Sequence, residues 1–318
     1  MDIALITSIL TIAMVAGTSL VYATIGEIIT ERAGILNLGV EGIMIMGAVS
    51  AFAAAFHTES AWTGVVVAML VGGTLALIHA FVTIGLRADQ VVSGLAVTLM
   101  GTGLASFVGQ KLGPEGGPLV GLTGPRFQEM AIPGLSQIPL IGEALFRQDM
   151  LVYLMYLVVP LTWYFLYKTR PGLHLRAIGE NPQTADAMGV DVFKLRYLYT
   201  VIGGMLIGLG GAHLSLAYTP GWSENLTGGR GWIAVALVIF ATWDPLRAVV
   251  GALLFGGVNA IQFRMQASGT AISANLLNML PYILTVVVLV LITWFETFRK
   301  RVGAPAALGL PYNREERH

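Results

Sequence analysis

The chain has 318 residues, of which 55% are hydrophobic and only 11% are charged, and its formal net charge is zero. Soluble domains carry about 25% charged residues, so this composition indicates an integral membrane protein. No basic patch points to a nucleic-acid partner, and the absence of cysteine excludes disulfides, thiol catalysis and cysteine-based metal sites.

Apolar runs long enough to cross a bilayer follow one another along the chain, because a span needs about 20 such residues. We therefore expect an all-α transmembrane helix bundle of about nine spans, with eight to ten as the range. The first span is expected to be retained, since Asp2 stands where a signal peptide would be basic. The seventh is short and is expected to be a half-helix or part of a broken pair. The expected spans are residues 3–25, 38–56, 61–85, 90–110, 149–167, 197–219, 231–243, 246–263 and 277–296.

Lysine and arginine orient the bundle, because cytoplasmic loops carry an excess of both. An N-terminus outside and a cytoplasmic C-terminus put thirteen of the 18 Lys and Arg inside and five outside. Residues 1–301 then form one transmembrane domain, with 169–196 as a cytoplasmic loop and 302–318 as a disordered cytoplasmic tail. Residues 111–148 form an ordered extracytoplasmic loop with a short interfacial helix, which either connects two spans or docks a soluble partner.

The longest strongly polar stretch is HLRAIGENPQTADAMGVDVFKLR, residues 174–196. Asn181 can cap a helix, Pro182 suits the first helical position, and Gly189 can end the helix in a left-handed conformation. The pattern predicts a helix of about two turns over Pro182–Met188, which is too short to be stable alone in water. It must pack on its own protein or on a partner, unless the stretch is an ordinary connecting loop.

A polar pair lies inside the second predicted span. The segment ILNLGVEGIMIMGA, residues 35–48, places Asn37 and Glu41 four residues apart on one helical face among glycines. A carboxylate within a span is costly to bury and therefore indicates a functional group. We predict that Glu41 lines a hydrated path; the alternative is a salt bridge to Arg32 or Arg87 near the cytoplasmic interface.

Further polar residues of the predicted spans can line the same path or can simply hydrogen-bond between helices. Glu27 and Glu31 precede the 35–48 segment and are expected at the membrane interface. No nucleophile–base pair or metal-ligand spacing is apparent, so we expect no catalytic residue, metal or cofactor. The candidate path residues are Asn37, Glu41, Ser93, Asn259 and Asn278.

Four ordered blocks of sequence, which together span nearly the whole chain, carry a family resemblance. The chain resembles the permease subunits of bacterial ABC importers, in the superfamily of ribose and branched-chain amino acid permeases. Within that superfamily it looks closest to the nucleoside and simple-sugar permeases, although it lacks one N-terminal span of the type members. The blocks are GEIITERAGILNLGVEGIMIMGA (26–48), ADQVVSGLAVTL (88–99), HLRAIGENPQTADAMGVDV (174–192) and GRGWIAVALVIFATWDPLRAVVGALLFGGVNAIQFRMQ (229–266).

The resemblance implies a multi-pass protein of the bacterial inner membrane that takes up nucleosides, with simple sugars as the alternative. It implies a cytoplasmic ABC ATPase, a second homologous permease in a heterodimer and an extracytoplasmic substrate-binding protein as partners. The LNLGVEG block would then lie near the translocation path and the ENPQTADAMG block would dock onto the ATPase. The coupling residues implied in this way are Arg176, Gly179, Glu180, Asn181, Pro182, Ala185 and Gly189.

Energy must come from another subunit, because the chain has no Gly-rich phosphate loop ending in Lys-Ser/Thr. The implied mechanism is alternating access driven by ATP binding to that subunit. A proton-coupled secondary transporter, in which Glu41 carries the proton, is the competing hypothesis. A membrane-embedded enzyme is the weakest hypothesis, since no catalytic constellation is apparent.

Overall fold

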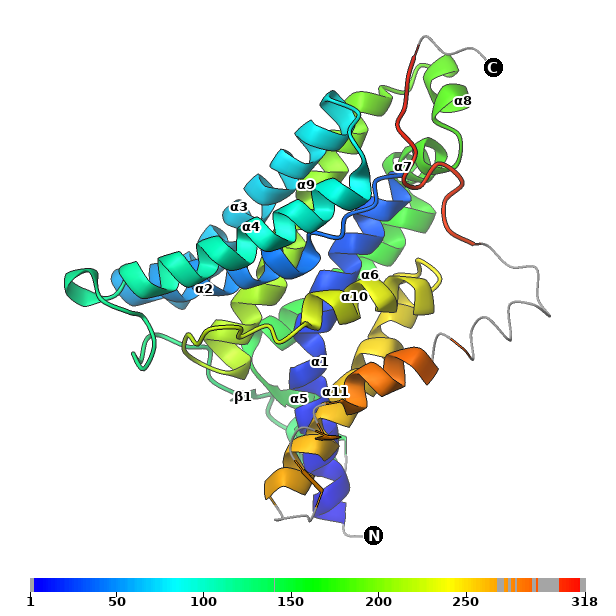
Figure 1. Cartoon of the computed structure of the whole chain (residues 1–318). Helices are drawn as coiled ribbons and strands as arrows, with labels where there is room; N and C mark the ends of the chain where they lie inside the picture. The colour runs from blue at the N-terminus through cyan, green and yellow to red at the C-terminus, as the bar shows by residue number, and fades with distance from the viewer. Residues whose placement is uncertain are drawn as a thin grey trace.

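The computed structural model describes residues 3–139, 141–267, 272–273, 276–277, 279–287, 290 and 303–314. These residues form a helical bundle around the long helix α1 (Figure 1). Seven of the described helices are long and apolar enough to cross a membrane. They are α1 (Ile3–Arg32), α2 (Val40–Thr58), α3 (Ala61–Ala80) with the π-helical turn η1 (Phe81–Gly85), α4 (Gln90–Lys111), α6 (Met150–Lys168), α9 (Val192–His213) with the π-helical turn η4 (Leu214–Tyr218), and α11 (Pro245–Ala267).

The short seventh span is confirmed as a short helix, α10 (Arg230–Phe240). Its 11 residues rise about 16 Å at 1.5 Å per residue, roughly half the thickness of a bilayer core. The ninth expected span, residues 277–296, lies partly outside the described residues. The total of nine spans and the sidedness of the bundle therefore stay predictions.

Glycines let the central helices touch through their backbones. An added Cβ at Gly208 of α9 would collide with the carbonyl oxygen of Ala68 on α3, and one at Gly211 would collide with that of Met44 on α2. Close backbone approach through small residues is the usual way for helices to pack in lipid. The three helices α2, α3 and α9 therefore form one tightly packed block.

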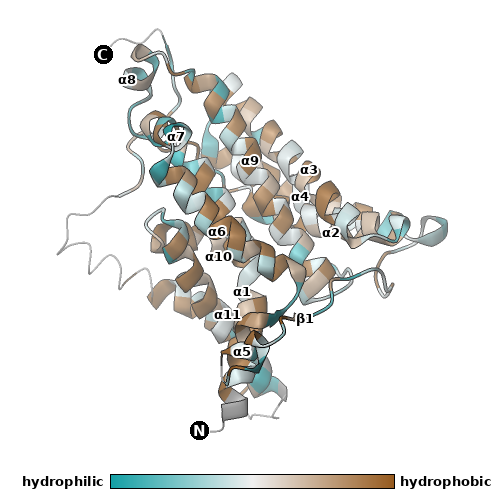
Figure 2. Cartoon of the chain, turned by 180° about the vertical axis from the view of Figure 1, so that it is seen from behind, coloured by the Kyte–Doolittle hydropathy of each residue, from teal (hydrophilic) through white to brown (hydrophobic). Residues whose placement is uncertain are grey.

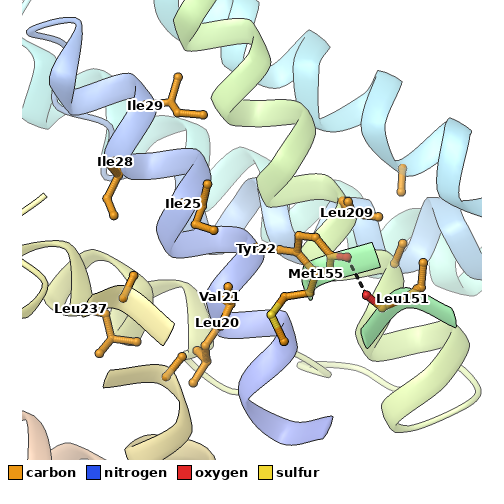
Figure 3. Packing of buried hydrophobic residues seen from close by; sticks show 14 of the residues in the cluster. Leu20, Val21, Tyr22, Ile25, Ile28, Ile29, Leu151, Met155, Leu209 and Leu237 are labelled. Atoms are coloured by element: carbon orange, nitrogen blue, oxygen red, sulfur yellow. Dashed lines mark hydrogen bonds between the residues drawn. The ribbon is translucent and has the colours of Figure 1, made fainter. Parts of the chain in front are cut away.

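Apolar side chains of α1 fill the centre of the bundle (Figure 3). Leu20 and Tyr22 are fully buried there. The Tyr22 hydroxyl donates a hydrogen bond of 2.7 Å to the Leu151 carbonyl oxygen, which joins α1 to the first turn of α6. A buried tyrosine needs such a partner for its hydroxyl, so this contact fixes α6 against α1.

Between α4 and α6 the described residues, which leave out residue 140, contain several short elements. They are η2 (Pro114–Gly116), β1 (Met130–Ala131), η3 (Leu135–Gln137), α5 (Gly142–Phe146) and β2 (Arg147–Gln148). The strands β1 and β2 pair antiparallel, with Met130 opposite Gln148.

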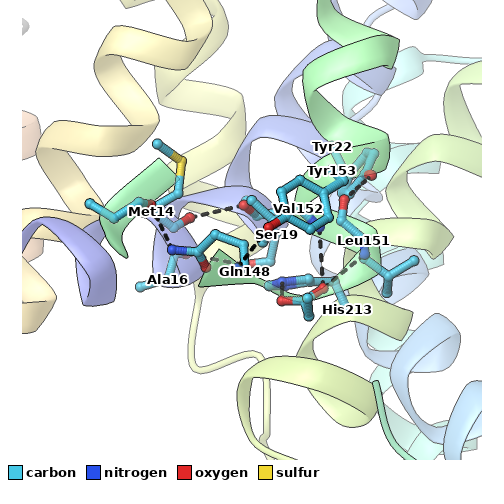
Figure 4. A network of polar contacts seen from close by, with 12 residues as sticks. Met14, Ala16, Ser19, Tyr22, Gln148, Leu151, Val152, Tyr153 and His213 are labelled. Atoms are coloured by element: carbon cyan, nitrogen blue, oxygen red, sulfur yellow. Dashed lines mark hydrogen bonds and ion pairs between the residues drawn. The ribbon is translucent and has the colours of Figure 1, made fainter. Parts of the chain in front are cut away.

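Asp149 ends this loop and caps α6, and Figure 4 shows Leu151, Val152 and His213 gathered at this point. Its Oδ1 accepts hydrogen bonds from the amides of Leu151 and Val152 at 2.8 and 3.2 Å. Its Oδ2 lies 3.7 Å from Nε2 of His213. Burial raises the pKa of Asp149, but the His213 ring and the two amides outweigh it and hold the pKa below its usual value.

Two short helices lie at the end of the molecule opposite the N-terminus, namely α7 (Arg170–Glu180) and α8 (Pro182–Ala187) (Figure 1). Hydrophilic residues gather at this end, whereas the middle of the bundle is mostly hydrophobic (Figure 2). The expectation of a disordered tail is wrong for residues 303–314, which pack against α7, α8 and the start of α9. The polar groups of a free tail would hydrogen-bond to water, whereas here backbone and side-chain groups pair with the bundle instead.

Candidate functional site

Two helices begin next to each other inside the bundle. The helix α2 begins at Val40 after the unwound segment 33–39, and α10 begins at Arg230 after the non-helical residues 219–229. An added Cβ at Gly231 would collide with the backbone N and Cα of Glu41, so the two N-terminal turns are in direct contact. Helix N-termini that meet within a membrane protein leave unsatisfied amides and a partial positive charge at that place.

Glu41 satisfies these amides. Its Oε1 accepts hydrogen bonds from the Thr227 hydroxyl at 2.5 Å and the Gly229 amide at 3.0 Å, and its Oε2 accepts one from the Gly231 amide at 2.6 Å. The Glu41 residue is 5% exposed. Its carboxylate therefore caps α10 from another helix, a charge-assisted arrangement that is stronger than a neutral one. In the described structure neither Arg32 nor Arg87 forms a salt bridge with it.

Arg230, the first residue of α10, turns toward α1. Its guanidinium donates to the Ala16 carbonyl oxygen at 2.9 Å and to the Ser19 hydroxyl at 3.3 Å. It also lies 4.9 Å from the centre of the Tyr218 ring. The start of α10 is thus fixed to α1 as well as to α2.

The unwound segment 33–39 is held in place by buried polar side chains of two helices. Glu27 of α1 accepts a hydrogen bond of 3.0 Å from the Asn37 amide through Oε1. Gln90 of α4 accepts one of 2.7 Å from the Leu36 amide. The Asn37 side chain in turn accepts the Gly39 amide at 2.9 Å, just before α2 begins. The amides of Leu36, Asn37 and Gly39 are therefore satisfied inside the protein, as a membrane interior requires.

Ser93 reaches the same segment through a histidine. The ring of His79 lies 3.0 Å from the Ser93 hydroxyl through Nδ1 and 3.1 Å from the Leu36 carbonyl oxygen through Nε2. An added Cβ at Gly94 would come within 2.6 Å of the Leu38 amide nitrogen, so α4 packs directly on the segment. The structure therefore brings Asn37, Glu41 and Ser93 together around residues 33–39.

The C-terminal end of α10 is held by the end of α1. The Trp243 indole N–H donates to Glu31 at 2.5 Å, and the Trp243 carbonyl oxygen accepts from Nη2 of Arg32 at 3.2 Å. Glu27 and Glu31 are 0% and 2% exposed, so both carboxylates lie inside the protein, and their expected place at the membrane interface stays a prediction. Oε1 of Glu27 and Oε2 of Glu31 each accept a hydrogen bond there, and α1 continues as a helix to Arg32.

A polar cavity of about 300 Å³ lies beside this contact, between the ends of α1 and α6, α7 and the turn that joins α10 to α11. Three arginines line it, and none of them has a carboxylate within 4.0 Å in the described part of the chain. The lining residues are Arg32, Tyr167, Arg176, Glu180, Thr242, Asp244 and Arg247.

The predicted polar helix is confirmed as α8, one residue shorter than expected. Asn181 caps it by accepting the Thr184 amide at 2.9 Å, and Gly189 follows it with a φ of 84°. Pro182 and Ala185 are buried, whereas Met188 is 81% exposed. One face of α8 therefore packs on its own protein and the other is open to a partner.

The other implied coupling residues lie in α7, a helix that the sequence interpretation missed. An added Cβ at Gly179 would collide with the Arg32 carbonyl oxygen, so α7 sits directly on the end of α1. The guanidinium of Arg176 lies 5.3 Å from the Tyr167 ring centre. The signal for α7 was present, because Thr169 caps it by accepting the Gly172 amide at 3.1 Å and Pro171 is in its first turn.

The remaining candidates are placed elsewhere. Asn259 lies on α11 and is 9% exposed. Among the described residues no hydrogen bond joins it to the Glu41 region. Asn278 lies outside the described residues.

The chain is similar to known proteins along most of its length. The family model for the permease component of branched-chain amino acid transport systems matches residues 8–292. TsgC13 of Haloferax volcanii, named as a glucose ABC transporter permease, is 44% identical and covers 94% of this chain and 95% of its own. The nucleoside ABC transporter permease NupC of Lactococcus lactis is 35% identical, with 94% of both chains covered. The guanosine permease NupQ of Bacillus subtilis is 33% identical over the full length of both.

A solved structure supports the fold. It is named as a metal-chelate type ABC transporter in an inward-facing conformation, and it matches with a TM-score of 0.52 over 89% of this chain and 84% of its own, at 17% identity. The match of the family model over most of the chain, the full-length relatives and the seven membrane-length helices agree. The chain is an integral membrane protein that belongs to the family of ABC transporter permease subunits.

Proposed function

We propose that this chain takes up nucleosides as one permease of an ATP-driven importer in the bacterial inner membrane. Two relatives that match nearly the whole chain, NupC and NupQ, are named for nucleoside and guanosine transport. Uptake of a simple sugar is the second candidate, because TsgC13, at 44% identity, is named for glucose. A substrate-binding protein and an ATPase are the general partners of such permeases, and we propose a heterodimer with a second, homologous permease.

The observation that carries the transport mechanism is the half-buried helix α8. Asn181 caps its start, its buried face packs on the protein, its exposed face carries Gln183 and Thr184, and exposed Met188 follows it. We infer that this face docks into the ATPase, as the resemblance implied. Motion of the ATPase would then pass through α7, whose Gly179 rests on the backbone of Arg32 at the end of α1.

We further infer that the substrate path runs beside the junction of α2 and α10. Glu41 lies at this junction, and Asn37 and Ser93 lie around the unwound segment that leads to it. Helix N-termini that meet inside a bundle are a recurring place for substrate binding in transporters. In the described conformation the Glu41 carboxylate accepts hydrogen bonds from the start of α10 and from the residues just before it. We infer that Glu41 shapes the path by holding α10. The roles of Asn259 and Asn278 stay predictions.

The test uses the complete transporter, co-purified with its partner subunits and reconstituted into liposomes with its binding protein outside. We expect ATP-dependent uptake of labelled guanosine that excess unlabelled nucleoside suppresses and excess glucose does not. ATP-dependent uptake of labelled glucose without uptake of guanosine would favour the sugar candidate. Uptake that needs a proton gradient and no ATP would instead establish the secondary transporter.

A further inference from the structure

The described C-terminal segment, residues 303–314, crosses the end of the bundle that carries α7 and α8 (Figure 1). The Ala307 amide donates a hydrogen bond of 2.9 Å to the Gly179 carbonyl oxygen at the end of α7. The Gly309 amide donates one of 3.3 Å to the Gly34 carbonyl oxygen. The segment therefore joins α7 to the unwound segment 33–39 through its backbone.

Side chains fasten the far end of the same segment to α8 and α9. Nε of Arg314 lies 2.9 Å from Oδ2 of Asp186 on α8. The Tyr312 ring packs on the Phe193 ring of α9 with centres 5.3 Å apart, and Tyr312 is 5% exposed. An apolar anchor and an ion pair thus hold one short stretch against two elements.

Buried Arg196 of α9 contacts this stretch through its guanidinium. Its side chain is buried on α9, and no carboxylate of the described residues lies within 4.0 Å of it. Its guanidinium donates to the Leu310 carbonyl oxygen at 3.3 Å and lies 6.0 Å from the Tyr312 ring centre. A buried charge is costly without such partners, and an arginine over a tyrosine face is favourable.

The Arg196 guanidinium also lies against the unwound segment. An added Cβ at Gly34 would come within 2.7 Å of its Nη2 and within 3.3 Å of the Ala307 carbonyl oxygen. The Gly34 end of segment 33–39 therefore packs against residues 303–314. On its other side the same segment leads to Glu41 and the start of α10.

We propose that residues 303–314 are a positioning strap that ties α8 to the unwound segment 33–39. The strap carries displacement of α8 to the start of α2, and through Glu41 to α10. This inference rests on the proposed function, in which α8 meets the ATPase. A segment that merely stabilised the fold would change the amount of assembled protein and leave the ratio of substrate moved to ATP hydrolysed unchanged.

The first experiment compares Tyr312→Ala with Tyr312→Phe in the reconstituted complete transporter. Phe keeps the ring on Phe193 and Arg196, so it should match the wild type in uptake and ATP hydrolysis. Ala should lower the uptake per ATP hydrolysed about fivefold or more, the lower end of typical coupling between sites. Both variants are compared at equal amounts of assembled complex.

The second experiment exchanges the ion pair between Arg314 and Asp186. Arg314→Glu and Asp186→Arg should each lower uptake about twofold, as expected for a partly exposed pair, and the double variant should recover it. Arg87→Glu is the matched control, because it reverses an exposed arginine outside α7, α8 and residues 303–314 and should leave uptake unchanged. If Tyr312→Ala fails to assemble, the charge exchange between Arg314 and Asp186 still tests the strap. Failure of the double variant to recover uptake counts against the strap.

Hydrogen exchange of the purified permease tests the strap separately from the proposed docking of α8 on the ATPase. Tyr312→Ala should speed amide exchange in residues 33–39 and 182–190 without any ATPase present. Unchanged exchange would overturn the strap. A different result would contradict only the proposed docking of α8 on the ATPase. In that case exchange would be faster in Tyr312→Ala, but the uptake per ATP hydrolysed would be unchanged in both Tyr312→Ala and Gly189→Val.

Discussion

At the scale of single residues, Glu41 combines an electrostatic and a geometric task. Its three partners all come from residues 227–231, which are 186 to 190 positions away in the chain. Sequence periodicity marked the residue as unusual because a carboxylate inside a span is rare. It could not identify the partner, since nothing local in the sequence records a contact over such a separation.

We expect Glu41→Ala to destabilise the complex by about 3 kcal/mol or more, because it leaves three buried donors without an acceptor. Glu41→Gln keeps one acceptor oxygen and should cost roughly half as much. Thermal unfolding in detergent and the amount of assembled complex measure both variants. An Ala variant that unfolds like the wild type but transports nothing would instead assign Glu41 directly to the substrate.

The local signals around α8 were more informative than those around Glu41. Asn181 and Gly189 predicted both ends of the helix, because capping depends on residues within one turn. The burial of Glu27 and Glu31 within the protein had no such local signal. Their burial depends on Asn37 and Trp243, which are distant in the chain or lie beyond a break in the helix.

At the scale of elements, α8 is followed by Met188 and then by Gly189, whose surroundings are open. No atom lies within 4 Å of a Cβ added at Gly189, and its φ is 84°. Gly189→Val should therefore act through the backbone alone, at about 1–2 kcal/mol for a left-handed β-branched residue, and loosen the end of α8. We expect lower ATPase stimulation by substrate-loaded binding protein. Gly189→Asn is the control, because asparagine tolerates this conformation; equal loss in both variants would contradict the backbone explanation.

Both ends of α10 are held by neighbouring helices. Glu41 of α2 holds its start, and Glu31 and Arg32 at the end of α1 hold Trp243 just after it. Trp243→Phe keeps an aromatic ring but removes the N–H that Glu31 accepts. We expect a loss of about 1–3 kcal/mol, since a buried carboxylate oxygen loses its donor. Thermal unfolding of the purified permease measures this loss. The exposed Trp232→Phe, at a residue that is 38% exposed, serves as the control and should change stability little.

Apolar run lengths predicted most of the helices but not all of their ends. The first helix was expected to stop at residue 25 and continues to Arg32, because its polar residues are buried and paired. The helix α7 was missed because it is amphipathic and too short for a span. Run length reports burial in lipid and is insensitive to helices that lie on the surface of the bundle.

At the scale of the whole molecule, the N-terminus and the α7–α8 end lie at opposite ends of the bundle (Figure 1). The packing of residues 303–314 could not be read from sequence, since a short polar stretch looks the same whether it is free or docked. Which end faces the cytoplasm rests on the distribution of Lys and Arg.

Labelling from either side of the membrane tests this orientation. The chain has no cysteine, so single cysteines at Gln137 and Gln183, both exposed, are clean reporters. A membrane-impermeant maleimide should label Gln137→Cys in intact cells, and Gln183→Cys only after the cytoplasmic side is opened. Labelling of both residues from one side would refute the predicted topology.

The glycine contacts among α2, α3 and α9 limit the substitutions that the protein tolerates at these glycines. Because a single methyl at Gly208 or Gly211 meets a carbonyl oxygen of a neighbouring helix, even alanine is excluded there. A saturation mutagenesis library selected for uptake should therefore show a stripe of positions that accept glycine alone. Gly103 of α4, which has no atom within 4 Å of an added Cβ, should accept many residues in the same library. The stripe would trace the seam along which these three helices must move as one body.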